Sequence, residues 1–191
     1  MIDRIIKVFT FKTEVYKEVE DDASFSQMAW ILVAAVALLS QLGSTASLVH
    51  VSGRGWIPSA LIGTVIAVAS FAFSCFIISW AGKQFFKADV TFDEMVRTLG
   101  LAYVWNIVGF LGIIGAVSPG LSCVTAPLRI AGSVAGLVAW FFAAKEALDL
   151  EWPETIGTVV IGWVAGLIIS MIFGVLGLGG AAIGGLFSSL R

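Results

Sequence analysis

Charged residues are scarce in this sequence: Asp, Glu, Lys and Arg make up 13% of its 191 residues, whereas a typical soluble domain has about 25%. Hydrophobic residues make up 59%, and the mean hydropathy is +0.99. One globular core cannot hide that much apolar surface from water, so the predicted solvent for most of the chain is lipid. This balance excludes an ordinary soluble protein, and we expect no nucleic-acid partner.

Residues that carry most enzymatic and metal chemistry are scarce as well. The two cysteines, Cys75 and Cys123, cannot make a disulfide framework. The single histidine, His50, has no ligand partner nearby and is interpreted as an interfacial residue. A Gly-x-Ser-x-Gly motif, a phosphate-binding glycine-rich loop and a paired-cysteine motif are all missing from the sequence. We therefore expect a non-enzymatic protein with no catalytic residues, no cofactor and no metal.

Residues 1–22 alternate apolar and charged positions. Ile2, Ile5, Ile6 and Phe9 fall at helical spacing, with lysines and glutamates between the later apolar residues. This pattern predicts a cytoplasmic amphipathic helix whose apolar face lies in the membrane interface. The alternative is a short helix packed on the cytoplasmic loops of the protein itself. Because the first 25 residues lack a continuous apolar run, no cleavable signal peptide is expected.

Five long apolar stretches follow in a single membrane domain, residues 23–191. A helix needs about 20 apolar residues to cross a bilayer core of about 30 Å. The stretches predict transmembrane helices at about 25–49, 57–81, 99–117, 128–147 and 156–176. The predicted fold class is an all-α integral membrane protein, a bundle of five transmembrane helices preceded by the amphipathic interfacial helix. The glycine-rich remainder, 177–191, is predicted to be at most a loose helix.

The segment Gly82 to Asn106 is the only strongly charged stretch between the apolar runs. Within it, Thr91 and Glu94 have the spacing of a capping box, in which each side chain satisfies a backbone N–H at a helix start. We therefore expect this segment to bring the chain back to one side of the membrane and to begin the third crossing.

The distribution of Lys and Arg predicts the orientation. With five crossings, eight basic residues lie on the side of the N-terminus and three, namely Arg54, Arg129 and Arg191, lie opposite. The positive-inside rule then places the protein in the cell membrane with its N-terminus in the cytoplasm and its C-terminus outside. All thirteen acidic residues also fall on the cytoplasmic side, where the net charge is −5. This face is therefore not a polybasic patch for anionic lipid.

The charged turns supply the candidate cytoplasmic interaction face. Its predicted residues are Asp89, Asp93, Glu94, Arg97, Lys145 and Glu146. Adjacent residues on a helix do not face each other, so Lys145 and Glu146 are interpreted as an interface anchor rather than a proton relay. The expected partners are membrane lipids, together with another protein or a second copy of the chain.

Gln41 and Asn106 are the polar side chains predicted at membrane depth. If both face the bundle interior, they can bond across it, each contact contributing about 0.6 kcal/mol. This structural role is the preferred interpretation, because no ionisable residue accompanies them. The alternative is a small transporter or channel, with a polar cavity between the first and third helices.

Two Gly-x-x-x-Gly pairs, Gly132 with Gly136 and Gly162 with Gly166, lie in the fourth and fifth predicted crossings. Such spacing lets helix backbones approach closely in lipid. We expect the fourth and fifth crossings to pack on each other through these glycines. A dimer interface is the alternative.

Three parts of the sequence resemble the Yip family, the Ypt/Rab-interacting membrane proteins. The residues concerned are Gly82, Phe85, Thr91–Phe92, Val96 and Gly100–Tyr103 before and in the third crossing, Lys145–Ala147 with Trp152–Pro153, and the pair Phe11 and Val15. The resemblance implies a five-helix membrane protein that organises membranes or recruits proteins. The long polar tail and the Asp-Leu-Tyr-Gly-Pro motif of the eukaryotic branch are missing, and Val104–Trp105 replaces a frequent proline. The chain is therefore similar to the short prokaryotic branch, for which Rab binding is not implied.

Overall fold

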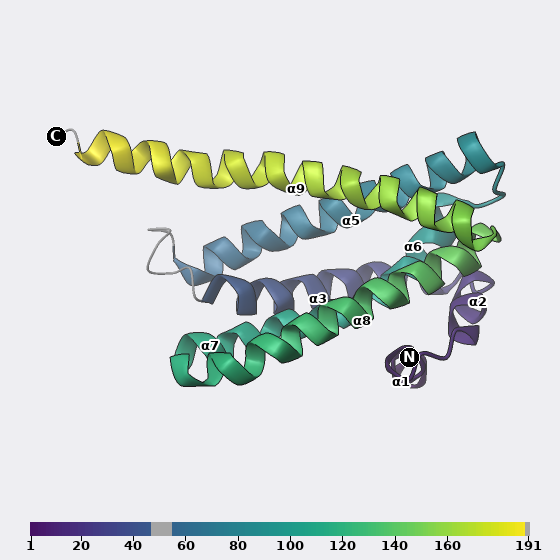
Figure 1. Ribbon diagram of the computed structural model, residues 1–191, viewed down its shortest axis with the longest axis horizontal. Coiled ribbons are helices and arrows are strands. Elements are labelled where there is room, and N and C mark those ends of the chain that lie inside the picture. The colour runs from purple at the N-terminus through teal and green to yellow at the C-terminus, as the bar shows by residue number, and fades with distance from the viewer. Residues whose placement is uncertain (47–54, 190–191) are drawn as a thin grey trace.

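The computed structural model describes residues 1–46 and 55–189. Every regular element in these two ranges is a helix (Figure 1). In chain order they are α1 (Ile2–Phe9), α2 (Glu14–Glu20), α3 (Phe25–Ala46), α5 (Trp56–Phe86), α6 (Phe92–Ala102), η1 (Tyr103–Leu111), α7 (Gly112–Val117), η2 (Pro119–Leu121), α8 (Ser122–Leu148) and α9 (Trp152–Ser189). The predicted end of the first crossing at 47–49 lies outside the described residues, as do His50, Arg54 and Arg191.

Four stretches are long and apolar enough to cross a membrane. They are α3, α5, the continuous stretch Phe92–Val117 and α8. Figure 1 shows these stretches and α9 running along the length of the molecule. In the range where the side chains of α9 are described, Trp152–Ile168 is apolar but shorter than the other four. The fifth crossing therefore stays a prediction, whereas a helical membrane-type fold is what the structure shows.

The helix α9 is longer than the sequence predicted. It spans 38 residues and continues without a break through the glycine-rich stretch up to Ser189. Glycine costs about 1 kcal/mol per residue in a helix relative to alanine. For this reason the sequence predicted at most a loose helix in this stretch.

The third crossing changes helix type partway along. After α6, the chain forms nine residues of 3₁₀-helix, η1, and then resumes as α7. The sequence predicted one continuous helix here. The change accompanies direct backbone contact with α3: a Cβ at Gly43 would collide with the carbonyl oxygen of Gly109 and lie 2.6 Å from the Cα of Phe110. A 3₁₀ stretch of this length is unusual and marks strain or a hinge.

The N-terminal segment is two helices rather than one. The chain turns between them at Phe11, whose φ is +53°. Val15 and Val19 of α2 are fully buried and belong to the central apolar cluster. For α2 the structure thus favours the alternative of packing on the protein itself, while α1 keeps Ile2 and Ile6 exposed.

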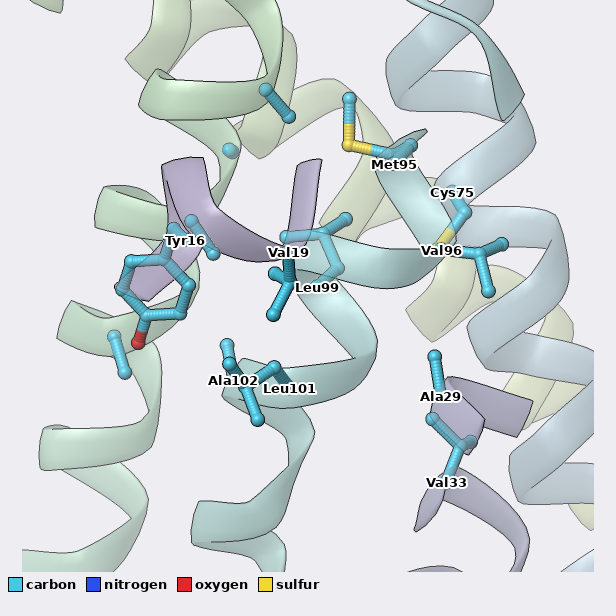
Figure 2. Packing of buried hydrophobic residues seen from close by; sticks show 14 of the residues in the cluster. Tyr16, Val19, Ala29, Val33, Cys75, Met95, Val96, Leu99, Leu101 and Ala102 are labelled. Carbon is cyan, nitrogen blue, oxygen red and sulfur yellow. The ribbon is translucent and has the colours of Figure 1, made fainter. Parts of the chain in front are cut away.

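The helix α6 is the centre of the core at one end of the molecule. All residues from Met95 to Ala102 are buried. Figure 2 shows Leu99, Leu101 and Ala102 beside Val19 of α2, with Val96 toward Cys75 of α5. Because α6 lies between α2, α3, α5 and α8, it fixes the position of the charged turns that surround it.

Candidate functional site

The charged side chains gather at one end of the molecule. The helices α1 and α2, the turn between α5 and α6, and the turn between α8 and α9 all lie at this end (Figure 1). All thirteen acidic residues of the chain belong to these segments or to the adjoining helix turns. In the part of the chain that the structure describes, Arg129 is the one charged residue away from this end.

Arg97 is not on the surface of this charged end. Its side chain is buried, with the residue only 6% exposed. Its Nε donates to the carbonyl oxygen of Val19 (3.0 Å), and its Nη2 donates to that of Glu20 (2.5 Å). These carbonyls end α2, where they lack partners within the helix and carry partial negative charge. Arg97 therefore anchors α2 to α6, and the structure removes it from the predicted interaction face.

The predicted capping box is confirmed at the start of α6. The backbone N–H of Thr91 donates to the Glu94 carboxylate (2.6 Å), and the backbone N–H of Glu94 donates to the Thr91 hydroxyl (3.2 Å). Glu94 is thus committed to holding the helix start. Asp89 and Asp93, on either side of Thr91, are exposed.

Ion pairs fasten α1 and the end of α2 together. Arg4 pairs with Asp22 at 2.9 Å, and Lys7 pairs with Glu18 at 2.7 Å. Hydrogen bonds from the Ser24 hydroxyl and from Arg4 lower the pKa of the Asp22 carboxyl. Solvent screens such exposed pairs, so they add little to stability. Their effect is therefore mainly to set how α1 lies on α2.

Lys145 and Glu146 are half-buried at the end of α8. The Lys145 ammonium lies 5.6 Å from the centroid of the Trp152 ring, within the range of a cation–π contact. This contact ties α8 to the start of α9, and the anchoring of Lys145 at the membrane interface stays a prediction. Asp149, in the turn that follows, is exposed.

A groove of about 540 Å³ lies among α5, η1, α8 and α9. Asn106 lines it, and its side-chain amide also donates to the backbone oxygen of Tyr103 (3.2 Å). Gln41 is not among the lining residues. It lies instead against Gly63 of α5, where an added Cβ would be 2.5 Å from its Oε1. The structure therefore does not bring Gln41 and Asn106 into one cavity between the first and third crossings.

The glycine pairs pack within the molecule, but with other partners than predicted. An added Cβ at Gly132 would collide with Val108, and one at Gly136 would lie 2.9 Å from the Cβ of Trp105. The glycine pair on α8 thus packs against η1 of the third crossing.

The second pair faces the second crossing. Added Cβ atoms at Gly162 and Gly166 would collide with Ile78 and with the Ser74 hydroxyl of α5. The fourth and fifth crossings therefore do not pack on each other through these glycines, although both pairs make close contacts within the molecule. In Figure 1, α8 and α9 meet at the charged end and then diverge.

Sequence reasoning missed the aromatic lining of the groove. Tyr103, Trp105, Trp140 and Trp163 all line it, although they come from three separate elements. No local pattern connects them. Among the described residues, no group of three or more His, Cys, Asp or Glu side chains is placed to hold a metal ion.

Comparison with known proteins gave one finding. No curated protein and no solved structure matched the chain significantly. The family model described as Yip1 domain matched residues 6–187, which is nearly the whole chain. The resemblance inferred from the charged segment before the third crossing is thus confirmed, and the chain belongs to the Yip1 domain family.

Proposed function

We propose that this membrane protein recruits a partner protein to the cytoplasmic membrane surface through its acidic end. The observation that carries the proposal is the set of exposed carboxylates on a rigid frame. Asp89, Asp93 and Asp149 lie in or beside the turns that join α5 to α6 and α8 to α9, and their side chains are exposed. The anchored α2 and the capped α6 hold these turns in place, so the carboxylates form a preorganised surface.

The helix lengths and the basic residues support the proposed orientation of this surface. With a rise of 1.5 Å per residue, the 38 residues of α9 span about 57 Å, more than the bilayer core of about 30 Å. Since α9 starts at the charged end, a fifth crossing puts the C-terminus on the opposite side. The excess of Lys and Arg at the charged end supports a cytoplasmic N-terminus.

The chemistry of the acidic end defines its partner. A face with a net charge of −5 in the sequence favours a basic protein surface, because complementary charge steers association and suppresses wrong partners. Ile2 and Ile6 of α1 are exposed beside it. With its exposed apolar side chains in the interface, α1 holds this end at the membrane surface.

Catalysis and transport have less support. Asp3, Glu18, Glu20 and Asp22 take part in ion pairs, Glu94 belongs to the capping box, and Asp89 and Asp93 lie exposed beside a turn, so these side chains do not form an acid–base pair in a cleft. A polar path for a small solute is disfavoured because Gln41 and Asn106 do not share a cavity. Recruitment therefore stands as the proposed, non-enzymatic function.

Charge reversal tests the proposal. The double variant Asp89→Lys with Asp93→Lys should reduce partner capture at least tenfold while leaving membrane insertion and helix content unchanged. The measurement is affinity capture of the full chain from crosslinked membranes, with partners quantified by mass spectrometry. The matched control, Lys83→Glu with Lys87→Glu, changes the same end in the opposite sense and should retain the same partners. If the acidic-end variant and the control variant both captured the same partners in the same amounts as the unmodified chain, recruitment by the acidic end would be contradicted.

A further inference from the structure

Arg129 is a cation in one of the apolar stretches that can span a membrane. It lies in α8, and in the described ranges it is the one charged residue away from the charged end. Its chain neighbours Leu128 and Ile130 are apolar and exposed. An ionised side chain among lipid chains is costly and is retained where a partner compensates its charge. Arg129 therefore needs an anion close to its guanidinium.

The protein itself does not supply this anion. Within residues 1–46 and 55–189, the Arg129 guanidinium has neither an ion pair nor a hydrogen-bond acceptor. Ser133, one turn further along α8, donates its hydroxyl to the backbone oxygen of Arg129 (2.8 Å) and leaves the guanidinium untouched. All thirteen acidic residues belong to the charged end. A second copy in the same orientation carries its acidic side chains at that end too, so the anion comes from outside the protein.

The depth of Arg129 matches the phosphates of the leaflet opposite the charged end. Arg129 precedes Lys145, near the charged end of α8, by 16 residues, which is a rise of about 24 Å. Because the hydrocarbon core is about 30 Å thick, Arg129 lies about 6 Å inside the far edge when Lys145 lies at the near edge. A long arginine side chain reaches the interface from such a depth. Figure 1 shows α7, which precedes α8, at this far end and away from α1 and α2.

The chemistry of the guanidinium favours a phosphate group as the anion. The guanidinium is planar, stays ionised, and presents N–H donors in a fork that matches two phosphate oxygens. Such charge-assisted, bidentate hydrogen bonds are stronger than bonds between neutral groups. In phosphatidylcholine the choline ammonium already balances the phosphate, whereas phosphatidylglycerol keeps a net negative charge. An anionic phospholipid is therefore the preferred source of the phosphate.

We propose that Arg129 binds the phosphate of one anionic phospholipid in the leaflet opposite the charged end. The acyl chains of this lipid lie in the bilayer beside α8, whose apolar stretch is the least buried of the four in the described residues. The site is separate from the acidic end and does not depend on partner recruitment there.

Lipid retention tests the site with matched losses of one positive charge. The full chain is reconstituted in equal parts of palmitoyl-oleoyl phosphatidylcholine and phosphatidylglycerol, extracted in mild detergent and analysed by native mass spectrometry. We expect one retained phosphatidylglycerol in the unmodified chain and about fivefold lower occupancy in Arg129→Gln, which loses the charge-assisted bonds. Lys12→Gln removes an exposed cation outside the apolar stretches and should keep the lipid. Equal loss in both variants would overturn the proposal, because the lipid would then follow net charge rather than Arg129.

A conservative variant and a competitor keep the test decisive. Arg129→Lys keeps the charge but loses the planar fork, so it should retain phosphatidylglycerol at an intermediate level. It is also the variant to measure if Arg129→Gln loses helix content by circular dichroism. A large excess of inorganic phosphate should leave the lipid bound, since free phosphate lacks acyl chains. Displacement by inorganic phosphate, or unchanged lipid occupancy in both Arg129 variants, would overturn the proposal.

Discussion

At the scale of single residues, Arg97 connects the N-terminal segment to the membrane bundle. Its guanidinium donates to two carbonyls at the end of α2 and to the Ser26 hydroxyl of α3 (3.1 Å). A buried arginine is costly unless its donors are satisfied. Here the acceptors are the unpaired carbonyls of a helix end. The same hydrogen bonds therefore satisfy both the buried guanidinium and the carbonyl groups that end α2.

Replacing Arg97 should release α2. Hydrogen bonds to charged groups contribute about 1.5–3 kcal/mol each, so Arg97→Met should lower the free energy of unfolding by roughly 2 kcal/mol or more. Amide hydrogen exchange in Glu14–Glu20 should accelerate, and the midpoint of unfolding in sodium dodecyl sulfate should fall. Arg97→Lys keeps the charge but loses the planar fork and should give a smaller effect.

Lys17 provides the control for this experiment. It is a cation on α2 whose side chain is 46% exposed and pairs with Glu20. Lys17→Met should change stability by no more than about 0.5 kcal/mol. If α2 kept its protection in Arg97→Met, the anchoring role would be refuted.

The contrast between Glu94 and Arg97 shows what sequence could predict at this scale. The capping box is local: Thr91 and Glu94 are three residues apart, and their spacing alone specifies both hydrogen bonds. The carbonyl acceptors of Arg97 lie 77 and 78 residues away. Their position depends on how α2 folds back on α6, which no local pattern contains.

At the scale of elements, the lengths of the apolar runs predicted the helices well, but not their neighbours. Runs of about 20 apolar residues must form helices in lipid, because every backbone group has to be paired. A Gly-x-x-x-Gly pair states only that a helix has a close contact. It does not say which helix fills it, and so Gly132 and Gly162 were assigned to the wrong partners.

Two glycines of α9 separate close packing from helix propensity. An added Cβ at Gly162 would collide with Ile78, whereas one at Gly157 would lie 3.8 Å from Phe86, an ordinary contact. Gly162→Ala should therefore destabilise the protein by about 1–3 kcal/mol. Gly157→Ala should be neutral or stabilise it by up to about 1 kcal/mol, since alanine favours helix.

The unfolding midpoint in sodium dodecyl sulfate measures both variants on the same scale. Shifts of the same sign and size would show that the contact between α9 and α5 does not depend on the small residue at 162.

At the scale of the whole molecule, the charged end is built differently from the rest. Three residues other than glycine have positive φ in the described ranges, namely Phe11, Lys87 and Asp149. Each lies in a turn at the charged end, between α1 and α2, between α5 and α6, and between α8 and α9. Packing of the surrounding helices must hold these turns, because a left-handed backbone is unfavourable for such residues.

The two native cysteines provide a test of how this end is oriented. Cys123 is exposed near the end opposite the charges, and Cys75 is buried. A membrane-impermeant maleimide should therefore label intact cells at Cys123, and Cys123→Ser should abolish the labelling. In the Cys123→Ser background, Lys12→Cys should be labelled only after permeabilisation, because α1 and α2 are predicted to lie in the cytoplasm.

The fifth crossing is tested in the same background with a cysteine appended after Arg191. If α9 spans the bilayer from its cytoplasmic start, this cysteine should react from outside in intact cells. Reaction only after permeabilisation would mean that α9 does not cross, and that both termini share one side. Labelling of Lys12→Cys in intact cells would instead reverse the orientation and place the acidic end outside, where it could not recruit a cytoplasmic partner.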